Sequence, residues 1–267
     1  MKITTLIENV VYDQGLTGEH GLSLYLESGD KKILFDTGQT GNFIDNSVNL
    51  GVDIGAVTDL VISHGHYDHT GGIVEFIRHN KQAIIHIKKE AFDKKYRSNK
   101  TDFIGIPFEV GLVKERLNFI DKITEIATGL FVMPDIVITE SDDLHYDGMF
   151  IKTENEFEPD RFNDELFLTV VHDSKISIIS GCSHNGITNI CNTAKNNFNL
   201  PFSHIIGGFH LKKSGEEQLS LINDYFRMID PVKIGVCHCT GIEKYGILKS
   251  VLGKKVFYNY TGKTIII

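Results

Sequence analysis

The sequence lacks the features that mark secreted and membrane proteins. Four cysteines in 267 residues are too few for a disulfide framework, so we expect reduced thiols. They are Cys182, Cys191, Cys237 and Cys239. No apolar run approaches the roughly 20 residues that span a bilayer. No signal peptide is expected either, because Glu8 interrupts the first apolar stretch and no small-residue cleavage site follows. These absences predict a cytoplasmic protein that does not enter a membrane.

An excess of positive charge is also missing. The formal net charge is −8 at pH 7, so bulk charge does not favour binding to nucleic acid or to an anionic membrane. Tryptophan is absent, whereas histidine occurs 12 times, and several histidines stand beside glycines at the ends of apolar runs. We therefore expect a small-molecule partner and a site rich in histidine.

Apolar runs alternate with helix-like segments along most of the chain. Strands are predicted where Val, Ile, Leu and Tyr cluster between turn residues, and helices where the apolar pattern has a longer period. The predicted strands are 3–12, 22–26, 32–35, 60–63, 83–87, 166–171, 175–180, 203–206, 233–236 and 255–258, and the predicted helices are 43–50, 73–80, 187–197, 216–228 and 243–252. This succession predicts an α/β fold.

Residues 88–160 interrupt this rhythm. Lysine and glutamate are frequent, and glycines and prolines such as Gly105, Pro107 and Pro134 cut the strand and helix signals short. We interpret the segment as an insertion or lid within a single domain of residues 1–267, because long irregular segments in compact domains are commonly functional.

Four potential metal ligands fall within six residues, directly after a predicted strand: His64, His66, Asp68 and His69. With Gly65 between them, His64 and His66 can turn both imidazoles toward one ion, and Asp68 and His69 can face a second. Imidazole and carboxylate together suit zinc, iron or manganese. The alternative, a polar surface loop, does not explain this density of ligands at a strand end.

Three further histidines, His184, His210 and His238, each follow a predicted strand. In α/β folds the carboxyl ends of strands are where sites are built. Any one of the three could be a structural histidine, but together with the run at 64–69 they favour a functional site. Cys237 and Cys239 flank His238. Alternate side chains of a strand point to opposite faces, so we expect these cysteines to be buried apolar residues and not zinc ligands.

Several motifs resemble one known family. The run at 64–69 resembles the signature of the metallo-β-lactamase superfamily, and Phe35-Asp36-Thr37-Gly38 resembles its first motif. Residues 19–23, 181–186, 207–211, 238–241 and 260–262 resemble a branch that includes the dihydropterin-ribofuranosylaminobenzene-phosphate synthases. The resemblance implies a four-layer αβ/βα sandwich, with two β-sheets packed together, helices outside and metals at one edge.

The resemblance also implies ligands for one or two divalent transition-metal ions, with zinc as the first expectation and iron or manganese as alternatives. The implied ligands are His64, His66, Asp68, His69, His184 and His238. Asp36 is expected to orient a ligand imidazole.

Two positions depart from the superfamily pattern. Cys182 follows Gly181 where many members carry a bridging Asp, so His184 is the substitute ligand and the role of Cys182 stays open. No histidine matches the third motif, and Asp164 is the nearest polar candidate.

The implied activity is hydrolysis of a small, phosphorylated or pterin-like substrate by a metal-bound hydroxide, with Asp68 contacting the nucleophile. His210 is expected to donate a proton or hold a phosphate. His20 either binds substrate at the same edge or is an exposed turn residue. Two alternatives stay open: a metal-assisted synthase that joins a dihydropterin to a ribofuranosylaminobenzene phosphate, and a metal-dependent binding or sensing protein without turnover. The sequence leaves the oligomeric state open.

Overall fold

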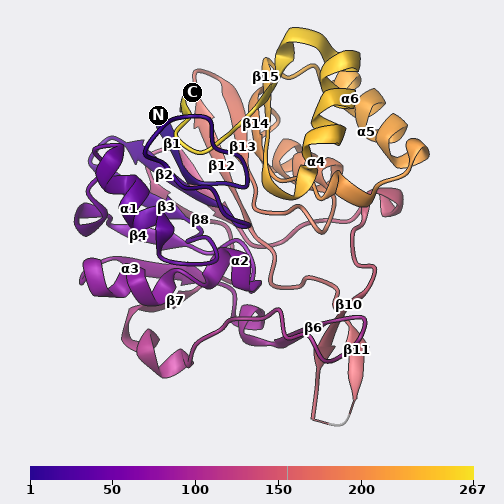
Figure 1. Ribbon diagram of the computed structural model, residues 1–267. Coiled ribbons are helices and arrows are strands. Elements are labelled where there is room, and N and C mark those ends of the chain that lie inside the picture. Colours follow the sequence, from indigo (N-terminus) through magenta and orange to yellow (C-terminus); the bar gives the residue numbers. More distant parts are fainter. Residues whose placement is uncertain (155) are drawn as a thin grey trace. The chain divides into compact units, whose positions relative to one another are not determined.

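The computed structural model describes residues 1–154 and 156–267 and divides into two compact units. Unit 1 comprises residues 1–121, 146–165 and 260–266, and unit 2 comprises residues 122–145, 166–259 and 267. Each unit contains one seven-stranded sheet (Figure 1). Among the described residues, no helix combines the length and the apolar character that crossing a membrane requires.

The sheet of unit 1 has the strand order β17-β1-β2-β3-β4-β5-β7. Its strands are β1 (Lys2–Ile7), β2 (Ser23–Ser28), β3 (Lys31–Phe35), β4 (Asp59–Val61), β5 (Ile84–Ile87), β7 (Leu117–Phe119) and β17 (Thr264–Ile266). Strands β17, β1, β2 and β3 pair antiparallel, whereas β3, β4, β5 and β7 pair parallel. The parallel half brings the carboxyl ends of β3 and β4 to one edge, where Asp36 and His64 follow.

Among the described residues, the α-helices of unit 1 are α1 (Asn42–Asn49), α2 (Tyr67–Thr70) and α3 (Ile73–His79). Phe43 of α1 and Phe76 of α3 are fully buried and pack with Leu34, Leu60 and Ile85 of the sheet in one apolar cluster. Burial of a side chain of this size stabilises a fold by about 1.5–3 kcal/mol. This packing anchors the segments that carry the histidine run.

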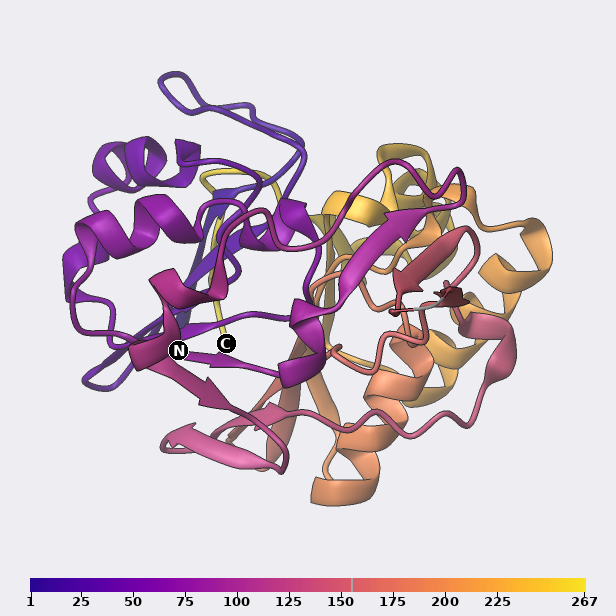
Figure 2. The same ribbon diagram turned by 90° about the horizontal axis from the view of Figure 1, so that it is seen from below.

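A second, smaller sheet of unit 1 consists of β6 (Lys94–Arg97), β10 (Met149–Lys152) and β11 (Phe157–Pro159), in the order β11-β10-β6. It stands apart from the seven-stranded sheet in Figures 1 and 2. Tyr96 packs edge-to-face on Phe103 and Phe157, with ring centroids 5.4 and 5.3 Å away. The aromatic contacts hold strands that are far apart in sequence together.

The sheet of unit 2 has the order β16-β15-β14-β13-β12-β9-β8. Its strands are β8 (Thr124–Ala127), β9 (Leu130–Met133), β12 (Phe167–His172), β13 (Lys175–Ile179), β14 (Phe202–Gly207), β15 (Lys233–Val236) and β16 (Val256–Tyr258). The predicted hairpin β12–β13 is confirmed as an antiparallel pair, and β13 to β16 are parallel. The parallel strands send three consecutive loops to one edge.

Three helices cover this sheet of unit 2: α4 (Ile187–Phe198), α5 (Glu216–Ile229) and α6 (Ile242–Leu252). Helix α4 packs on β13 and α6 packs on β16. The buried side chains of α4 include Ile187, Ile190 and Ala194, which recur at the three- and four-residue spacing of a helix face. All four cysteines of the chain lie among the described residues and are buried, and none of them forms a disulfide.

The predicted α/β succession is confirmed, with element bounds that differ by a few residues; α2 and β17 were not predicted. The segment 88–160 is more divided than the sequence suggests. Strand β7 joins the sheet of unit 1, and β8 and β9 join that of unit 2. Also within this segment, β10 pairs with β6 on one side and with β11 on the other to form the separate sheet. The insertion or lid hypothesis now concerns these three strands and stays a prediction.

Candidate metal centre

The histidine loop, residues 62–66, leaves β4 and enters α2 at Tyr67. His64 Nε2 and His66 Nδ1 are 3.0 Å apart, and the rings of His64 and His69 have centroids 4.3 Å apart. Two nitrogens that bind one tetrahedral zinc ion at 2.0–2.1 Å are about 3.4 Å from each other. The imidazoles of His64 and His66 therefore stand close to the spacing that a shared ion requires.

The four candidate ligands of unit 1 are buried, and burial affects the protonation state in which they can bind a metal ion. His64 and His69 are fully buried, and His66 and Asp68 are each 6% exposed. Burial lowers the pKa of His64 well below its ordinary value, and the nearby His69 and His66 lower it further. His64 is thus held as the neutral imidazole, the form whose lone pair binds metal.

Asp36, which directly follows β3, contacts both the histidine loop and helix α2. Its Oδ2 accepts hydrogen bonds from His69 Nδ1 at 2.6 Å and Ser63 Oγ at 2.7 Å, and its Oδ1 accepts one from Ser63 N at 2.7 Å. These contacts fix the ring of His69 so that Nε2 is the nitrogen that faces Asp68, at 3.9 Å from Oδ2. A residue that orients a ligand imidazole makes this kind of contact.

His20 lies beside Asp68. Its Nε2 is 3.2 Å from Asp68 Oδ2, and its side chain is 50% exposed. Asn9 Nδ2 lies 3.2 Å from the other ring nitrogen of His20. His20 therefore occupies the solvent side of the Asp68 carboxylate.

Asp164 has a different environment from the one the sequence suggests. Its Oδ2 accepts a hydrogen bond from Gly65 N at 2.7 Å, and its Oδ1 accepts one from Lys95 Nζ at 2.9 Å. Both oxygens are thus engaged inside unit 1. The interpretation of Asp164 as a substitute for the third-motif ligand gives way to a supporting role for the histidine loop.

In unit 2, the loops after β13, β14 and β15 are tied together by hydrogen bonds. Gly208 N donates to Gly181 O at 2.9 Å, Ser183 Oγ donates to Gly208 O at 2.7 Å, and Phe209 N donates to Thr240 Oγ1 at 3.0 Å. A Cβ on Gly208 would lie 2.6 Å from Cys239 Sγ and 2.7 Å from Gly181 O, so only glycine fits. The three loops form one rigid group.

These loops gather a second cluster of donors. The rings of His184 and His210 have centroids 4.3 Å apart. Donor atoms of Cys182, His210 and Cys239 all lie within 4.8 Å of one another. Like the histidine loop, the cluster lies at the carboxyl ends of parallel strands.

Cys239 is buried as predicted, but the interpretation of it as a simple apolar residue is wrong. Its Sγ accepts a hydrogen bond from His210 N at 3.3 Å. Burial alone would raise the pKa of Cys239, but hydrogen bonds with Cys182 and His210 and the charge of His238 hold it well below its ordinary value. Side chains do not alternate between two faces here, because the chain turns into a 3-10 helix at His238.

Four non-glycine residues in the two clusters have positive φ: Asp36 (59°), Ser183 (58°), His210 (51°) and His238 (51°). Such residues are uncommon outside glycine, although Asp and His tolerate the region better than most. Strain of this kind costs about 1–3 kcal/mol and persists where the surroundings dictate the conformation, which is often at functional sites.

His145, which the sequence analysis missed, joins the cluster of unit 2. His145 N donates to His184 O at 2.8 Å, and its ring centroid lies 5.4 Å from that of His210. Among the described residues, neither His145 Nε2 nor His210 Nδ1 has a hydrogen-bond partner, although both atoms are buried. Asp143 Oδ1 is 3.6 Å from His145 Nε2. Buried polar atoms usually bind a protein group, an ordered water or an ion, so these two ring nitrogens are candidates for contact with a ligand. The one sequence feature that could have drawn attention to His145 is the Asp-Leu-His sequence at 143–145.

A family model for the metallo-beta-lactamase superfamily matches residues 16–156, more than half of the chain. The chain belongs to this superfamily. An uncharacterized protein of Methanocaldococcus jannaschii is 31% identical over 98% of this chain and 99% of its own length. The crystal structure of Tm1679, named a metal-dependent hydrolase of the superfamily, is 31% identical, has a TM-score of 0.88 and covers 100% of this chain and 99% of its own.

A second Methanocaldococcus jannaschii relative is the 7,8-dihydropterin-6-methyl-4-(beta-D-ribofuranosyl)-aminobenzene-5'-phosphate synthase. It is 25% identical over 91% of this chain and 88% of its own length. Metallo-beta-lactamase superfamily membership implies that the chain binds divalent metal, and its relatives include hydrolases and a synthase. The imidazole, carboxylate and thiol donors described above fit a divalent transition metal.

Proposed function

We propose that this protein is a metal-dependent hydrolase that acts on a small phosphorylated or pterin-like substrate. The observation that carries the proposal is the buried histidine loop, in which His64 is held neutral and His69 is fixed by Asp36. A surface loop rich in histidine would have neither the burial nor the carboxylate contact.

The proposed metal ligands are His64, His66, Asp68 and His69 in unit 1 and His184 and His238 in unit 2. When bound, a divalent transition-metal ion supplies Lewis-acid activation of water at neutral pH. Zinc is the first candidate because imidazole and carboxylate ligands suit it. Iron and manganese accept the same donors.

The chain's own residues supply the rest of the chemistry. Asp36 holds His69 in one orientation. Asp68 is proposed to hold the attacking water, and His20, 3.2 Å from the Asp68 carboxylate, to contact substrate from the solvent side. His210 is proposed to protonate the leaving group or bind a phosphate oxygen, because its buried Nδ1 has no hydrogen-bond partner among the described residues.

A metal-assisted synthase is the second candidate. The similarity to the dihydropterin synthase extends over 91% of this chain, which supports a shared substrate chemistry. In that case the same ligands would organise a condensation on a phosphoribosyl substrate.

Loading the protein with zinc, manganese or iron and screening phosphodiesters, lactones and thioesters tests the proposal. The dihydropterin condensation is assayed in parallel, and an Asp68→Asn variant is the control. We expect hydrolysis of at least one class, lost in Asp68→Asn. Condensation without hydrolysis would favour the synthase. Metal binding without turnover in any assay would favour a binding or sensing protein and overturn the proposed activity.

A further inference from the structure

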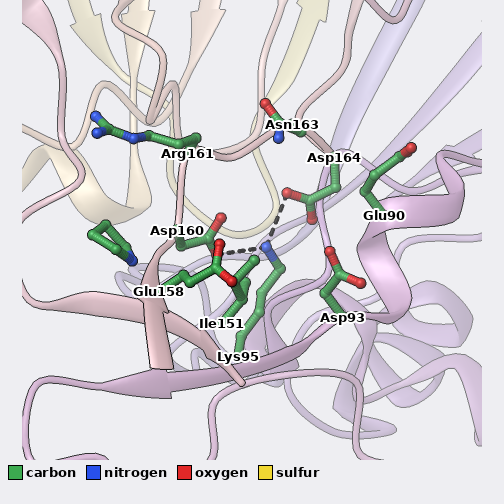
Figure 3. Close-up of a pocket in the computed structure, with 10 residues that line it drawn as sticks. Glu90, Asp93, Lys95, Ile151, Glu158, Asp160, Arg161, Asn163 and Asp164 are labelled. Carbon is green, nitrogen blue, oxygen red and sulfur yellow. Dashed lines mark hydrogen bonds and ion pairs between the residues drawn. The ribbon is translucent and has the colours of Figure 1, made fainter. Parts of the chain in front are cut away.

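Lys95 of β6 is a buried charge in unit 1, only 1% exposed. Its Nζ donates to Asp160 Oδ2 at 2.6 Å and to Asp164 Oδ1 at 2.9 Å (Figure 3). The two carboxylates come from the segment that follows β11, so the lysine binds this segment to the small sheet. A buried lysine is retained only where such partners compensate its charge.

The lysine–carboxylate cluster reaches the histidine loop through one hydrogen bond. Asp164 Oδ2 accepts it from Gly65 N at 2.7 Å, so one carboxylate joins Lys95 to the peptide between the two histidines. Gly65 also packs against Ala91, whose carbonyl oxygen would lie 2.0 Å from a Cβ at this position. The hydrogen bond to Asp164 and the close contact with Ala91 together restrict the peptide that separates His64 from His66.

Phe162 makes a second connection from the same segment. Its N–H donates to Asp160 Oδ1 at 2.8 Å, and its backbone has a positive φ of 50°. The ring stands edge-on to His66 with centroids 5.4 Å apart and lies under Lys95 Nζ at 5.0 Å. Lys95 and Asp160 thus hold the Phe162 ring against the imidazole of His66.

We propose that Lys95, Asp160 and Asp164 are positioning residues that hold His64 and His66 at the spacing a metal ion requires. This inference rests on the proposed metal site. It also gives the small sheet β6–β10–β11 a part in metal binding, because Lys95 belongs to that sheet. The residues act through Gly65 and Phe162 and touch neither metal nor substrate.

The test measures binding and visible absorption of Co²⁺ by the metal-free protein, together with hydrogen exchange at the Gly65 amide before metal is added. The variants are Asp164→Ala, the milder Asp164→Asn and Lys95→Met. Lys31→Met is the matched control, because Lys31 Nζ pairs with Asp59 Oδ2 at 2.9 Å at the opposite ends of β3 and β4.

We expect Asp164→Ala to weaken Co²⁺ binding by about 10–100-fold, the usual effect of losing a residue that supports a metal ligand. Its Co²⁺ absorption should change and its Gly65 amide should exchange faster. Asp164→Asn should fall between Asp164→Ala and the unchanged protein, because its amide oxygen still accepts the Gly65 hydrogen bond. Lys31→Met should keep the affinity and the spectrum.

Unchanged Co²⁺ affinity and spectrum in a folded Asp164→Ala or Lys95→Met protein, with no acceleration at Gly65, would overturn the inference. It would leave these residues a purely structural role. If the protein without substitutions binds no Co²⁺, the proposal of a metal site is wrong. Gly65 exchange in the metal-free variants then still decides whether Asp164 holds the loop.

Discussion

The two donor clusters are built in opposite ways. In unit 1, four candidate ligands come from six consecutive residues, and the surrounding polar groups include two carboxylates, Asp36 and Asp164. In unit 2, the candidates come from three loops that are 20 to 30 residues apart in sequence, and the surrounding groups include two thiols, Cys182 and Cys239. Both clusters nevertheless lie at the carboxyl ends of parallel strands.

The difference shows two ways of fixing an imidazole. The contiguous cluster needs an external support, because neighbouring residues of one loop can move together. The assembled cluster is supported by its own loops, since Gly208, Ser183 and Thr240 hydrogen-bond each loop to the next. Substitutions in the two clusters should therefore have different effects on metal binding and on turnover.

The largest expected effect is loss of metal from the contiguous cluster. We expect His64→Ala and His66→Ala each to lose at least one ion per chain, because the two nitrogens stand 3.0 Å apart as a pair. Elemental analysis of purified protein measures this. His172→Ala, at a side chain 65% exposed, is the control. Full metal retention in both loop variants would contradict the assignment of His64 and His66 as metal ligands. His184→Ala and His238→Ala extend the same measurement to unit 2.

A smaller effect is expected from His210 in the assembled cluster. His210→Ala should keep its metal content while turnover on the substrate found in the screen falls by about 10²–10⁴, the usual cost of removing a general acid. His204→Ala, in the middle of β14, the strand that precedes the His210 loop, is the control. If His210→Ala loses an ion instead, His210 is a ligand together with Cys182 and Cys239, and the assignment of His184 must be revised.

The smallest effect concerns Asp59, at the start of β4, the end of the strand opposite to the histidine loop. Burial would raise its pKa, but hydrogen bonds from His86, Thr58 and Lys31 lower it to about 2. Because the folded pKa lies below the ordinary value of 3.8, the stabilisation is complete above about pH 4 and is lost as pH falls through about 2.

Asp59→Asn should therefore lower the free energy of unfolding by roughly 2 kcal/mol at pH 7. The difference from the unchanged protein should shrink between pH 4 and pH 2. Urea titrations at several pH values, on metal-free protein, measure both. A difference that stays constant across this range would contradict the pKa assignment.

The sequence predicts the contiguous cluster more completely than the assembled one, for a physical reason. Ligand density within one loop is visible in a sequence, and so is the strand that precedes it. The α/β order was predictable because short apolar runs and longer-period segments alternate with clear turn residues between them.

Contacts between distant segments were not predictable in this way. Nothing in the sequence joins Asp164 to Gly65 across 99 positions, or Cys239 to His210 across 29. His145 was missed because it falls in the segment interpreted as an insertion. The error about Cys239 has a local cause: a positive φ at His238 ends the strand geometry one residue earlier than the alternation argument assumed.

The pairing of β17 with β1 has a consequence for synthesis on the ribosome. Lys2 pairs with Ile266 and Thr4 with Thr264, so β1 waits for a strand that is translated much later. Residues 166–259 of unit 2 are translated in between and can complete their parallel sheet beforehand. Until then, the outer edge of β1 presents unpaired backbone groups, which other strands can capture. Nascent chains stalled before residue 264 should therefore depend on chaperones more than the released protein does.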